Sequence, residues 1–300
     1  MVDTFKKDVL VIGAGGLLGK ALADDFSRTW DTEGFARWKL DIVDWFDTLA
    51  KIKMVSPRVI VLSAAYTDVD GCEKNILKAA KVNTQGPSNV AKAAREIGAT
   101  LVYISTDYVF DGEAKTPYQE TDATQPLSVY GVSKLQGEQA VLSVLNRAIV
   151  IRSSWLFGEG KKGFIPFVLE SLKEKKPMTV VADKFGCCTY AVDLAAGIRN
   201  IISLILKNQY DFKNNVLHVT NNGVCSWYDM ALCTAEALGM KDVAISKTTL
   251  AEFPFKARRP RYSAMDNGRF NAMTGKPLRA WQEALKEFVT HSHSAPPLAG

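Results

Sequence analysis

The stretch DVLVIGAGGLLG, residues 8–19, constrains the fold of this chain more than any other. Its first half is a continuous apolar run, which is typical of a strand buried on both faces of a sheet. Gly13, Gly16 and Gly19 follow at intervals of three, and a helical pattern begins among them. In such a strand–turn–helix unit the glycines permit a tight turn, close approach of the backbone to a pyrophosphate, and close packing of helix on strand. The stretch therefore predicts a dinucleotide-binding loop, with a plain strand-to-helix turn as the alternative.

Apolar runs alternate with helical patterns through the first half of the chain. Further runs of strand character lie at residues 59–65, 100–106 and 148–154, and a helical pattern separates each from the next. Strands separated by helices form right-handed crossovers and therefore a parallel sheet. The pattern predicts an α/β fold with a doubly wound, Rossmann-like parallel sheet. Residues 216–221 are expected to add one more strand.

The rhythm changes after residue 157, where a polar, glycine-rich loop is followed by helical patterns and long loops. We expect a smaller, mostly helical substrate-binding domain made of discontinuous pieces. The predicted dinucleotide-binding domain comprises residues 1–157 and 189–221, the predicted substrate-binding domain comprises residues 158–188 and 222–290, and a disordered tail is expected at 291–300.

Composition excludes several classes of protein. The chain of 300 residues is 47% hydrophobic with a net charge of +5, and its basic residues are scattered among acidic ones, so no nucleic-acid partner is expected. No apolar run approaches the roughly 18 residues of a membrane span, and the N-terminal run is expected to be a strand and not a signal peptide. The five cysteines are an odd number in a long chain with no expected signal peptide, which indicates reduced thiols and a cytoplasmic location. They include no Cys-x-x-Cys pair. With only three histidines, no metal site is expected.

The segment YGVSK places Tyr130 four residues before Lys134, near the start of an expected helix. The two side chains would share one helix face. Thr106 ends the third apolar run, and the carboxyl ends of parallel strands face the ligand crevice. The three side chains are therefore expected to converge beside a bound nicotinamide. A pair of solvated residues on a helix surface is the alternative for YGVSK.

This combination of side chains suits the reduction of a ketone. A nicotinamide supplies the hydride, and a tyrosine supplies the proton once its pKa falls from about 10 toward 7. The ammonium of Lys134 and the oxidised nicotinamide would both favour the phenolate of Tyr130. Lys134 would also hold the nicotinamide ribose, and Thr106 would hydrogen-bond the substrate carbonyl and the developing alkoxide.

The choice between NADPH and NADH depends on the end of the second strand, within residues 34–42. This segment offers Arg37 and Lys39 for a 2′-phosphate, whereas Asp41 lies later and is expected near the adenine. The pattern favours NADPH, with NADH as the second choice. A solvated Arg37 with no ligand is the alternative.

The chain resembles the extended short-chain dehydrogenases/reductases over nearly all of residues 8–290. The motifs that carry the resemblance are GAGGLLG, LDIVD, SAAYTDVDGCE, STDYVFDG, YGVSKLQGE, RSSWLFG and RRPRYSAMD. The resemblance implies NAD(P)H-dependent reduction of the 4-keto group of dTDP-4-dehydro-6-deoxy-L-mannose to dTDP-L-rhamnose. This oxidoreductase reaction would serve polysaccharide biosynthesis, with a dTDP-sugar as partner and a homodimer as an open assembly.

Site residues follow from the matched motifs. The expected catalytic residues are Thr106, Tyr130 and Lys134. The expected cofactor contacts add to Tyr130 and Lys134 a set of loop residues: Gly13, Gly16, Leu17, Leu18, Gly19, Arg37, Asp41, Ile42, Ala64, Ala65 and Tyr66. The expected substrate contacts are Thr106, Asp107, Asn83, Trp155, Arg258 and Arg259. Solvated loop charges are the alternative for the two arginines, and a core position is the alternative for Trp155.

One segment departs from the family pattern. FGCCTY places Cys188 where the family usually has a proline, which loosens the backbone. Cys187 and Cys188 are expected to be buried structural thiols, with a redox role as the alternative. Two other functions stay open, namely reduction of another nucleotide-linked 4-keto sugar and a non-catalytic NADP-binding role that resembles the methionine adenosyltransferase β subunit.

Overall fold

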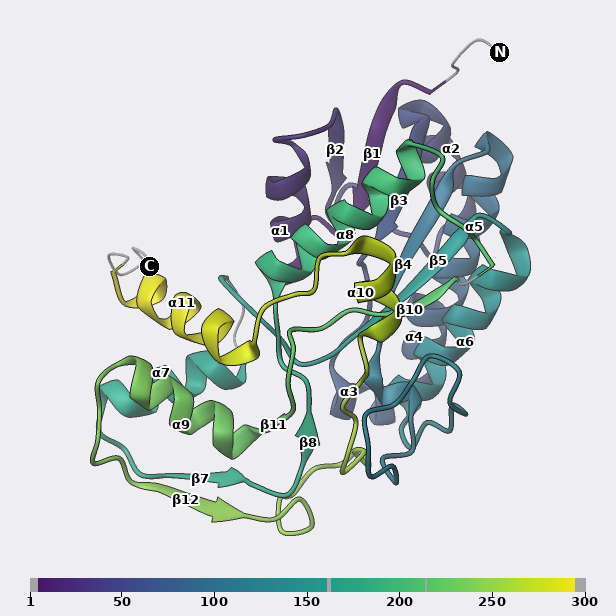
Figure 1. Cartoon of the computed structure of the whole chain (residues 1–300). Coiled ribbons are helices and arrows are strands. Elements are labelled where there is room, and N and C mark those ends of the chain that lie inside the picture. Colours follow the sequence, from purple (N-terminus) through teal and green to yellow (C-terminus); the bar gives the residue numbers. More distant parts are fainter. Residues whose placement is uncertain (1–4, 161–162, 214, 295–300) are drawn as a thin grey trace.

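A six-stranded parallel sheet forms the centre of the computed structural model, which describes residues 5–160, 163–213 and 215–294 (Figure 1). The strands lie in the order β10-β5-β4-β3-β1-β2, and every neighbouring pair is parallel. Their bounds are β1 Lys7–Ile12, β2 Thr32–Phe35, β3 Pro57–Leu62, β4 Thr100–Thr106, β5 Ala148–Ser153 and β10 Val216–His218. This sheet confirms the predicted α/β fold and its doubly wound arrangement.

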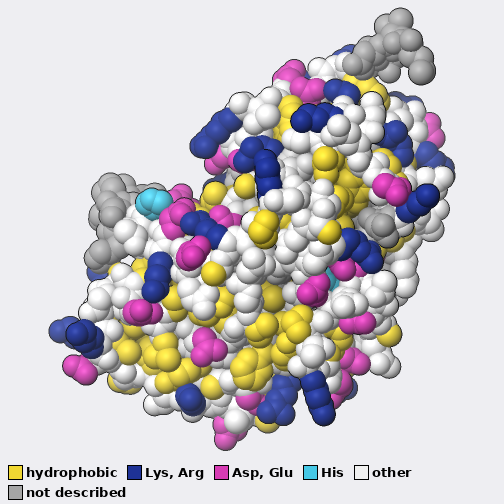
Figure 2. Space-filling view, in the orientation of Figure 1, with side chains coloured by type: hydrophobic (Ala, Val, Ile, Leu, Met, Phe, Trp, Pro, Cys, Tyr) yellow, Lys and Arg dark blue, Asp and Glu magenta, His cyan; other side chains and the backbone are white. Residues whose placement is uncertain are grey.

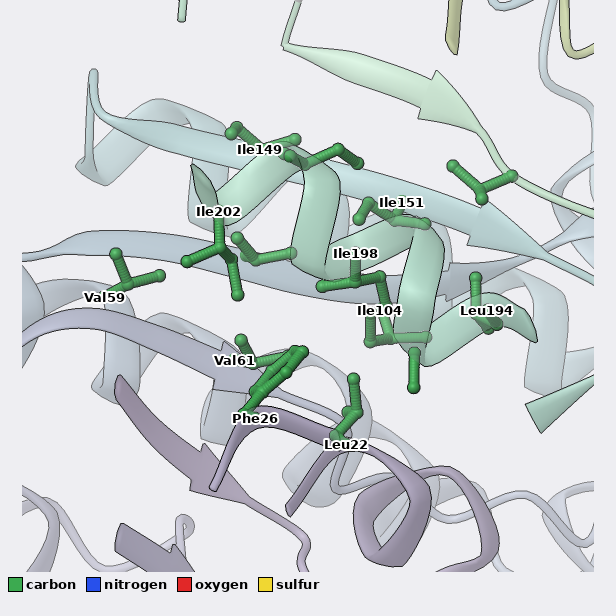
Figure 3. Close-up of a cluster of buried hydrophobic side chains, with 14 of the residues drawn as sticks. Leu22, Phe26, Val59, Val61, Ile104, Ile149, Ile151, Leu194, Ile198 and Ile202 are labelled. Carbon is green, nitrogen blue, oxygen red and sulfur yellow. The ribbon is translucent and has the colours of Figure 1, made fainter. Parts of the chain in front are cut away.

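Helices cover both faces of the sheet, because the strand residues alternate between two apolar cores. Val9 and Val11 point to one core, which contains α1 (Leu17–Phe26) and α8 (Ala191–Leu206). Figure 3 shows side chains of this core from both helices and from the sheet. Leu10 and Ile12 point to the other core, which is closed by α2 (Trp45–Val55), α5 (Gly86–Ile97) and α6 (Val129–Val144). Burial of each such side chain stabilises the fold by about 1.5–3 kcal/mol, so the two cores hold the strand ends rigidly.

The helical pattern expected between the strand-like runs at 59–65 and 100–106 is not one regular helix in the structure. It divides into the end of α4 (Ile76–Ala80), a π-helical turn at Lys81–Gln85, and α5, and α3 (Val69–Lys74) comes before it. Pro87 has no N–H group to donate to the preceding turn. The carbonyl of Asn83 instead accepts a hydrogen bond from the Tyr103 hydroxyl at 3.3 Å. The break gives Asn83 a defined position inside the protein.

Three expected strands end earlier than the apolar runs do. β3 ends at Leu62, β5 at Ser153 and β10 at His218. After β3 the backbone leaves the sheet, and the N–H groups of Ser63 and Ala64 donate to the carbonyl of Ile12 at 2.9 and 3.2 Å. The residues that follow β3 and β5, among them Ser63, Ala64 and Ser154, line a cleft beyond the sheet edge, so the strand-like runs there extend past the strands.

A smaller unit lies beyond the carboxyl ends of the strands (Figure 1). Its cores join α7, α9 and α11 with short strands. This unit contains α7 Phe164–Lys173, α9 Trp227–Ala237 and α11 Trp281–Ser294, with the strand pairs β6 Leu156–Phe157 and β9 Thr189–Tyr190, β7 Met178–Val181 and β12 Ile245–Thr248, and β8 Phe185–Gly186 and β11 Cys225–Ser226. The unit therefore contains more strand than expected from its sequence. Helix α10 (Gly268–Thr274) instead packs on the core of the central sheet, and the 3-10 turn Asp107–Val109 follows β4 directly.

Two sequence expectations fall at the limits of the described residues. α11 continues to Ser294, so the tail expected to be disordered from residue 291 is helical over its first four residues. Its remainder, 295–300, lies outside the described residues, as do 161 and 162 of the glycine-rich loop. Within the described parts, no helix is both long enough and apolar enough to cross a membrane.

Candidate active site

A cleft of about 1210 Å³ opens at the carboxyl edge of the sheet, where the loops after β1, β3, β4 and β5 meet. The chain passes from β1 to β2 on one side and to β3 on the other, so the cleft lies at a topological switch point, the usual ligand site of such sheets. Its lining includes most of the predicted site residues: Gly13, Gly16, Leu17, Leu18, Gly19, Arg37, Asp41, Ile42, Ala64, Ala65, Tyr66, Thr106, Asp107, Tyr130, Lys134 and Trp155.

The three glycines of the first loop have different structural roles. Gly13 has φ +98°, and a Cβ there would lie 2.6 Å from the backbone nitrogen of Ala64. A Cβ on Gly19 would lie 1.9 Å from the carbonyl oxygen of Gly13, so helix α1 packs on the loop only without a side chain. A Cβ on Gly16 would meet only the Gly13 oxygen, at 3.4 Å, and Gly16 is exposed at the N-cap of α1. The missing side chain at Gly16 therefore leaves room for a ligand in the cleft and is not required by packing within the protein.

The N-terminus of α1 supports the same conclusion. Gly16 provides no side chain to cap the helix, so the first N–H groups of α1 face the cleft. Such groups and the positive end of the helix dipole bind phosphate. The exposed glycine, the uncapped helix and an open cleft together fit a dinucleotide pyrophosphate.

Lys39 and Arg37, two cationic side chains that follow β2, differ in their contacts. Lys39 is paired with Glu33 at 2.5 Å, and its Nζ lies 4.5 Å from the centroid of the Phe35 ring. Arg37 is exposed and makes no ion pair or hydrogen bond with another described residue. The Asp41 carboxylate accepts a hydrogen bond from the Val43 N–H at 3.0 Å. Arg37 is therefore the cation of this edge that is available to a 2′-phosphate.

The catalytic candidates form the floor of the cleft. Thr106 is the last residue of β4, and Tyr130 and Lys134 lie one turn apart on α6. Ser128 caps this helix by accepting a hydrogen bond from the Gly131 N–H at 3.2 Å. All three side chains are more than nine-tenths buried yet line the cleft. The structure thus brings together the three residues that the sequence predicted.

Burial controls the proton chemistry of these groups. It lowers the pKa of Lys134 to about 7, although the nearby carboxylate of Glu138 opposes the shift. Lys134 Nζ donates to the carbonyl of Ile104 at 2.7 Å and lies 4.1 Å from the centroid of the Tyr103 ring. Burial also raises the pKa of Tyr130 above its usual value, and a hydrogen bond with Thr106 acts in the opposite direction. The phenol therefore holds its proton in the protein alone, and a positive nicotinamide beside it would ease release.

Asn83 supports the cleft from behind. Its side chain is completely buried; it accepts from the Tyr66 N–H at 2.8 Å and donates to the Tyr66 carbonyl and the Ser133 hydroxyl, both at 3.0 Å. The amide joins the loop after β3 to helix α6, and it has no surface in the cleft. The hydrogen-bonding groups of Asn83 are thus used within the protein, and its contact with the substrate stays a prediction.

The two arginines expected at the nucleotide differ from each other. Arg259 donates to both carboxylate oxygens of Asp70, at 2.8 and 3.1 Å, and its guanidinium lies 3.6 Å from the centroid of the Phe255 ring. Arg258 is exposed on the same loop. The guanidinium of Arg259 lowers the pKa of Asp70 to about 2. Arg259 is therefore already engaged in an ion pair, and neither arginine lines the cleft in this structure.

The wall opposite the sheet contains residues that sequence reasoning missed. Tyr108 packs edge-on against Tyr130 with ring centroids 5.5 Å apart, and Ser263 donates to the Asp107 carboxylate at 2.6 Å. Lys184 is completely buried beside this wall. Tyr108 lies in the STDYVFDG motif and Ser263 in the RRPRYSAMD motif, whereas Lys184 lies in none of the quoted motifs. Only the tertiary contacts show the positions of all three at this wall.

Cys187 and Cys188 are both buried and are free thiols, as expected of structural cysteines. Burial raises the pKa of the Cys187 thiol to about 11, which makes it unreactive near neutral pH. Cys188 packs in the apolar core of the smaller unit. In the described parts of the chain, no group of three or more His, Cys, Asp or Glu side chains is arranged to hold a metal ion.

Comparison with known proteins finds similarity over nearly the whole chain. Residues 7–294 match the family model described as the RmlD substrate binding domain. The dTDP-4-dehydrorhamnose reductase of Aggregatibacter actinomycetemcomitans is 35% identical over 292 residues, which cover 95% of this chain and 99% of that protein. A probable dTDP-4,6-dihydroxy-2-methyloxan-3-one 4-ketoreductase of Streptomyces antibioticus is 35% identical over 280 residues, or 93% of each chain.

A solved structure extends the likeness to three dimensions. The dTDP-4-dehydrorhamnose reductase of Bacillus anthracis, in complex with NADP, matches with a TM-score of 0.89 and 34% identity. The match covers 96% of this chain and 100% of that one.

Proposed function

This chain belongs to the family described as the RmlD substrate binding domain, and on that premise we propose that it is an NADPH-dependent reductase of a dTDP-linked 4-keto sugar. The substrate is dTDP-4-dehydro-6-deoxy-L-mannose, and the product is dTDP-L-rhamnose. The relative in Aggregatibacter actinomycetemcomitans has the corresponding name, and the Bacillus anthracis structure contains NADP. Arg37, free at the end of β2, supports NADPH over NADH.

One observation carries the proposal: Thr106, Tyr130 and Lys134 share the floor of a cleft that the glycine loop enters from the other side. Nicotinamide, when bound, supplies the hydride to the carbonyl carbon. Tyr130 delivers its phenolic proton to the carbonyl oxygen, so the ketone becomes a secondary alcohol. Thr106 holds that oxygen while negative charge develops on it.

Lys134 stabilises the state that follows proton transfer. Its ammonium favours the phenolate of Tyr130, and the same group can hold the ribose of the nicotinamide half. The hydrogen bond of Lys134 Nζ to Ile104 uses one of three donors and leaves two for a ligand. The short reach from sheet edge to helix α6 keeps these groups in place without a mobile segment.

The smaller unit is proposed to hold the sugar nucleotide. Trp155 and Asp107 line the cleft on that side, and Arg259 lies on the loop of residues 251–267 next to α3. The division into a dinucleotide-binding domain and a substrate-binding domain stays a prediction. We propose a cytoplasmic location, supported by five free thiols in the described chain. The homodimer stays a prediction.

A different nucleotide-linked 4-keto sugar is the second candidate. The likeness to the probable ketoreductase of Streptomyces antibioticus is as high in identity as that to the rhamnose enzyme. Both reactions need the same hydride and proton, so the floor of the cleft serves either one. The sugar-facing wall decides between them.

The test is NADPH oxidation, followed at its absorbance band, with the 4-keto sugar nucleotide generated from dTDP-glucose by the two preceding activities. We expect turnover, and we expect Tyr130→Phe to reduce kcat by about 10³-fold because general acid catalysis is lost. The Kd for NADPH should change less than twofold in this variant, since the phenol acts on the proton.

The controls separate the alternatives. Turnover retained in Tyr130→Phe would remove the tyrosine from its role. A wild-type protein that binds NADPH but is inactive with this sugar would be tried with other nucleotide-linked 4-keto sugars. Inactivity with all of them would favour the non-catalytic, NADP-binding alternative.

A further inference from the structure

Lys184 is a buried cation that the proposed reaction does not use. It lies between β7 and β8 in the smaller unit, and its side chain is completely buried. Its ammonium makes no hydrogen bond to any described residue. Burial of an ammonium without an acceptor is strongly unfavourable, and an apolar side chain would fill the same space without that cost. A role that requires the positive charge of Lys184 would explain why a lysine occupies this buried position.

Aromatic rings surround this ammonium. Nζ lies 4.4 Å from the ring centroid of Trp155, 5.5 Å from that of Tyr108 and 5.6 Å from that of Trp227. Cations over aromatic faces are attracted electrostatically, and most strongly by tryptophan when water is excluded. Trp155 and Tyr108 both line the catalytic cleft, so Lys184 stands directly behind its sugar-facing wall.

The backbone around Trp155 also depends on this packing. Trp155 has φ +45°, a left-handed conformation that is rare for a bulky residue. Its indole lies against Gly186, where a Cβ would meet the ring at 2.7 Å, and it packs edge-on against Trp227. The indole is thus held on three sides, by Gly186, Trp227 and the ammonium of Lys184.

The other partner of Lys184 is the carboxylate of Asp107, which belongs to the end of the central sheet. The two groups interact electrostatically, and the Asp107 carboxylate partly opposes the effect of burial, which lowers the pKa of Lys184 to about 8. Asp107 Oδ1 accepts a hydrogen bond from the catalytic Thr106 at 3.1 Å. Its other oxygen accepts from Ser263. The segment of Ser263 is hydrogen-bonded to the strand after Lys184, through the Phe185 carbonyl at 2.8 Å.

We propose that Lys184 is a positioning residue that sets the sugar-facing wall against the catalytic floor of the cleft. From behind, its ammonium packs against the indole of Trp155 in the smaller unit and, without a direct ion pair, attracts the carboxylate of Asp107, which follows β4. Asp107 in turn orients the hydroxyl of Thr106. The inference rests on the proposed function, since it names a determinant of binding and turnover for the same reaction.

The experiment compares Lys184→Met with Lys173→Met, which removes an exposed lysine of the same unit. Methionine keeps the length of the stem and loses the charge. We expect Lys184→Met to raise KM for the sugar nucleotide about tenfold and to lower kcat about tenfold, while the Kd for NADPH stays within twofold. Lys173→Met should leave all three within twofold. Wild-type KM and kcat in Lys184→Met, or a parallel loss of NADPH affinity, would overturn the proposal.

Two further variants separate charge from shape. Lys184→Arg retains a cation that also stacks on indole, and should recover most of the loss. In an Asp107→Asn background, Lys184→Met should cost less than about twofold more in kcat, because residues that act as a unit are not additive. An arginine variant as poor as the methionine one, or full additivity with Asp107→Asn, would exclude the electrostatic role.

A spectroscopic measurement that needs no turnover tests the role of Lys184 independently of the proposed function. The Trp155–Trp227 pair should give an exciton band in circular dichroism, identified by its loss in Trp227→Phe. We expect Lys184→Met to change that band and Lys173→Met to leave it intact, even if the sugar nucleotide proves to be the wrong substrate. An unchanged band in Lys184→Met would overturn the proposal. If Lys184→Met fails to fold, Lys184→Gln provides the same comparison.

Discussion

The two sides of the cleft are built in different ways. The cofactor side uses backbone: glycines, helix N–H groups and the ends of parallel strands, all within the first 66 residues. The sugar side uses side chains from separate segments, among them Tyr108, Trp155, Lys184 and Ser263. A pyrophosphate is the same in every dinucleotide, so a short local motif can bind it. A sugar is recognised by shape, and shape here requires distant parts of the chain.

Two buried lysines make this difference concrete. Lys134 donates a hydrogen bond to a strand carbonyl and lies on the helix face that its spacing from Tyr130 predicts. Lys184 has aromatic rings and a carboxylate as neighbours, and its ammonium makes no hydrogen bond within the described chain. The first lysine belongs to a local motif and the second to a tertiary cluster. Substitutions on the cofactor side and on the sugar side of the cleft should therefore change different measured properties.

The largest expected effect comes from two glycines of the same loop. Gly16→Val should weaken NADPH binding by about 100-fold while the fold is kept, since the added atoms point into the cleft. Gly19→Ala should instead lower the free energy of unfolding by about 3 kcal/mol, because its Cβ collides with the Gly13 carbonyl. Fluorescence titration with NADPH and urea unfolding measure the two effects. Equal loss of stability in both variants would show that Gly16 serves the fold and not the ligand.

A smaller effect is expected at the 2′-phosphate. Arg37→Ala should raise the KM for NADPH about tenfold and leave that for NADH nearly unchanged, because one charged hydrogen-bonding group is lost. Lys39→Ala is the matched control, since Lys39 is already paired with Glu33. Steady-state kinetics with both cofactors measures the ratio. If Lys39→Ala shifts the ratio as much as Arg37→Ala does, the assignment to Arg37 is wrong.

The smallest expected effect is the change in the free energy of unfolding with pH that the two buried lysines cause. Burial lowers the pKa of Lys134 to about 7 and that of Lys184 to about 8, from an ordinary value of 10.5. Between these values and 10.5 the unfolded chain binds more protons, so stability rises with pH. We expect each lysine to contribute a gain of about 1 kcal/mol between pH 7 and 8.5. The buried thiols oppose part of this gain, because their pKa values are raised in the folded protein and unfolded thiols begin to ionise in the same window.

Urea unfolding of the protein without cofactor, in the wild type, Lys134→Met and Lys184→Met, measures this gain. Lys134→Met should remove the larger part, since its lower pKa places more of the titration in this window. A change in stability from pH 7 to 8.5 that is as large in Lys134→Met as in the wild type would contradict the lowered pKa of Lys134.

Local patterns predicted the sheet and the catalytic floor well. The glycine spacing, the apolar runs and the Tyr130–Lys134 interval each depend on neighbours within one turn or one strand. The sequence could not show the surroundings of a side chain whose partners lie far along the chain. Asn83 was expected at the sugar, but Tyr66 and Ser133 use its amide. Arg258 was expected at the nucleotide and is exposed, whereas its neighbour Arg259 is paired with Asp70.

The sequence by itself determined the parallel sheet, the dinucleotide loop and the three catalytic side chains, because periodicity and short spacing place these groups relative to the backbone. Only the tertiary structure decided what stands opposite them. The position of Lys184 between Trp155 and Asp107 joins segments that are 29 and 77 residues away in the chain. No local pattern encodes such a contact, because it depends on how two separately formed cores meet.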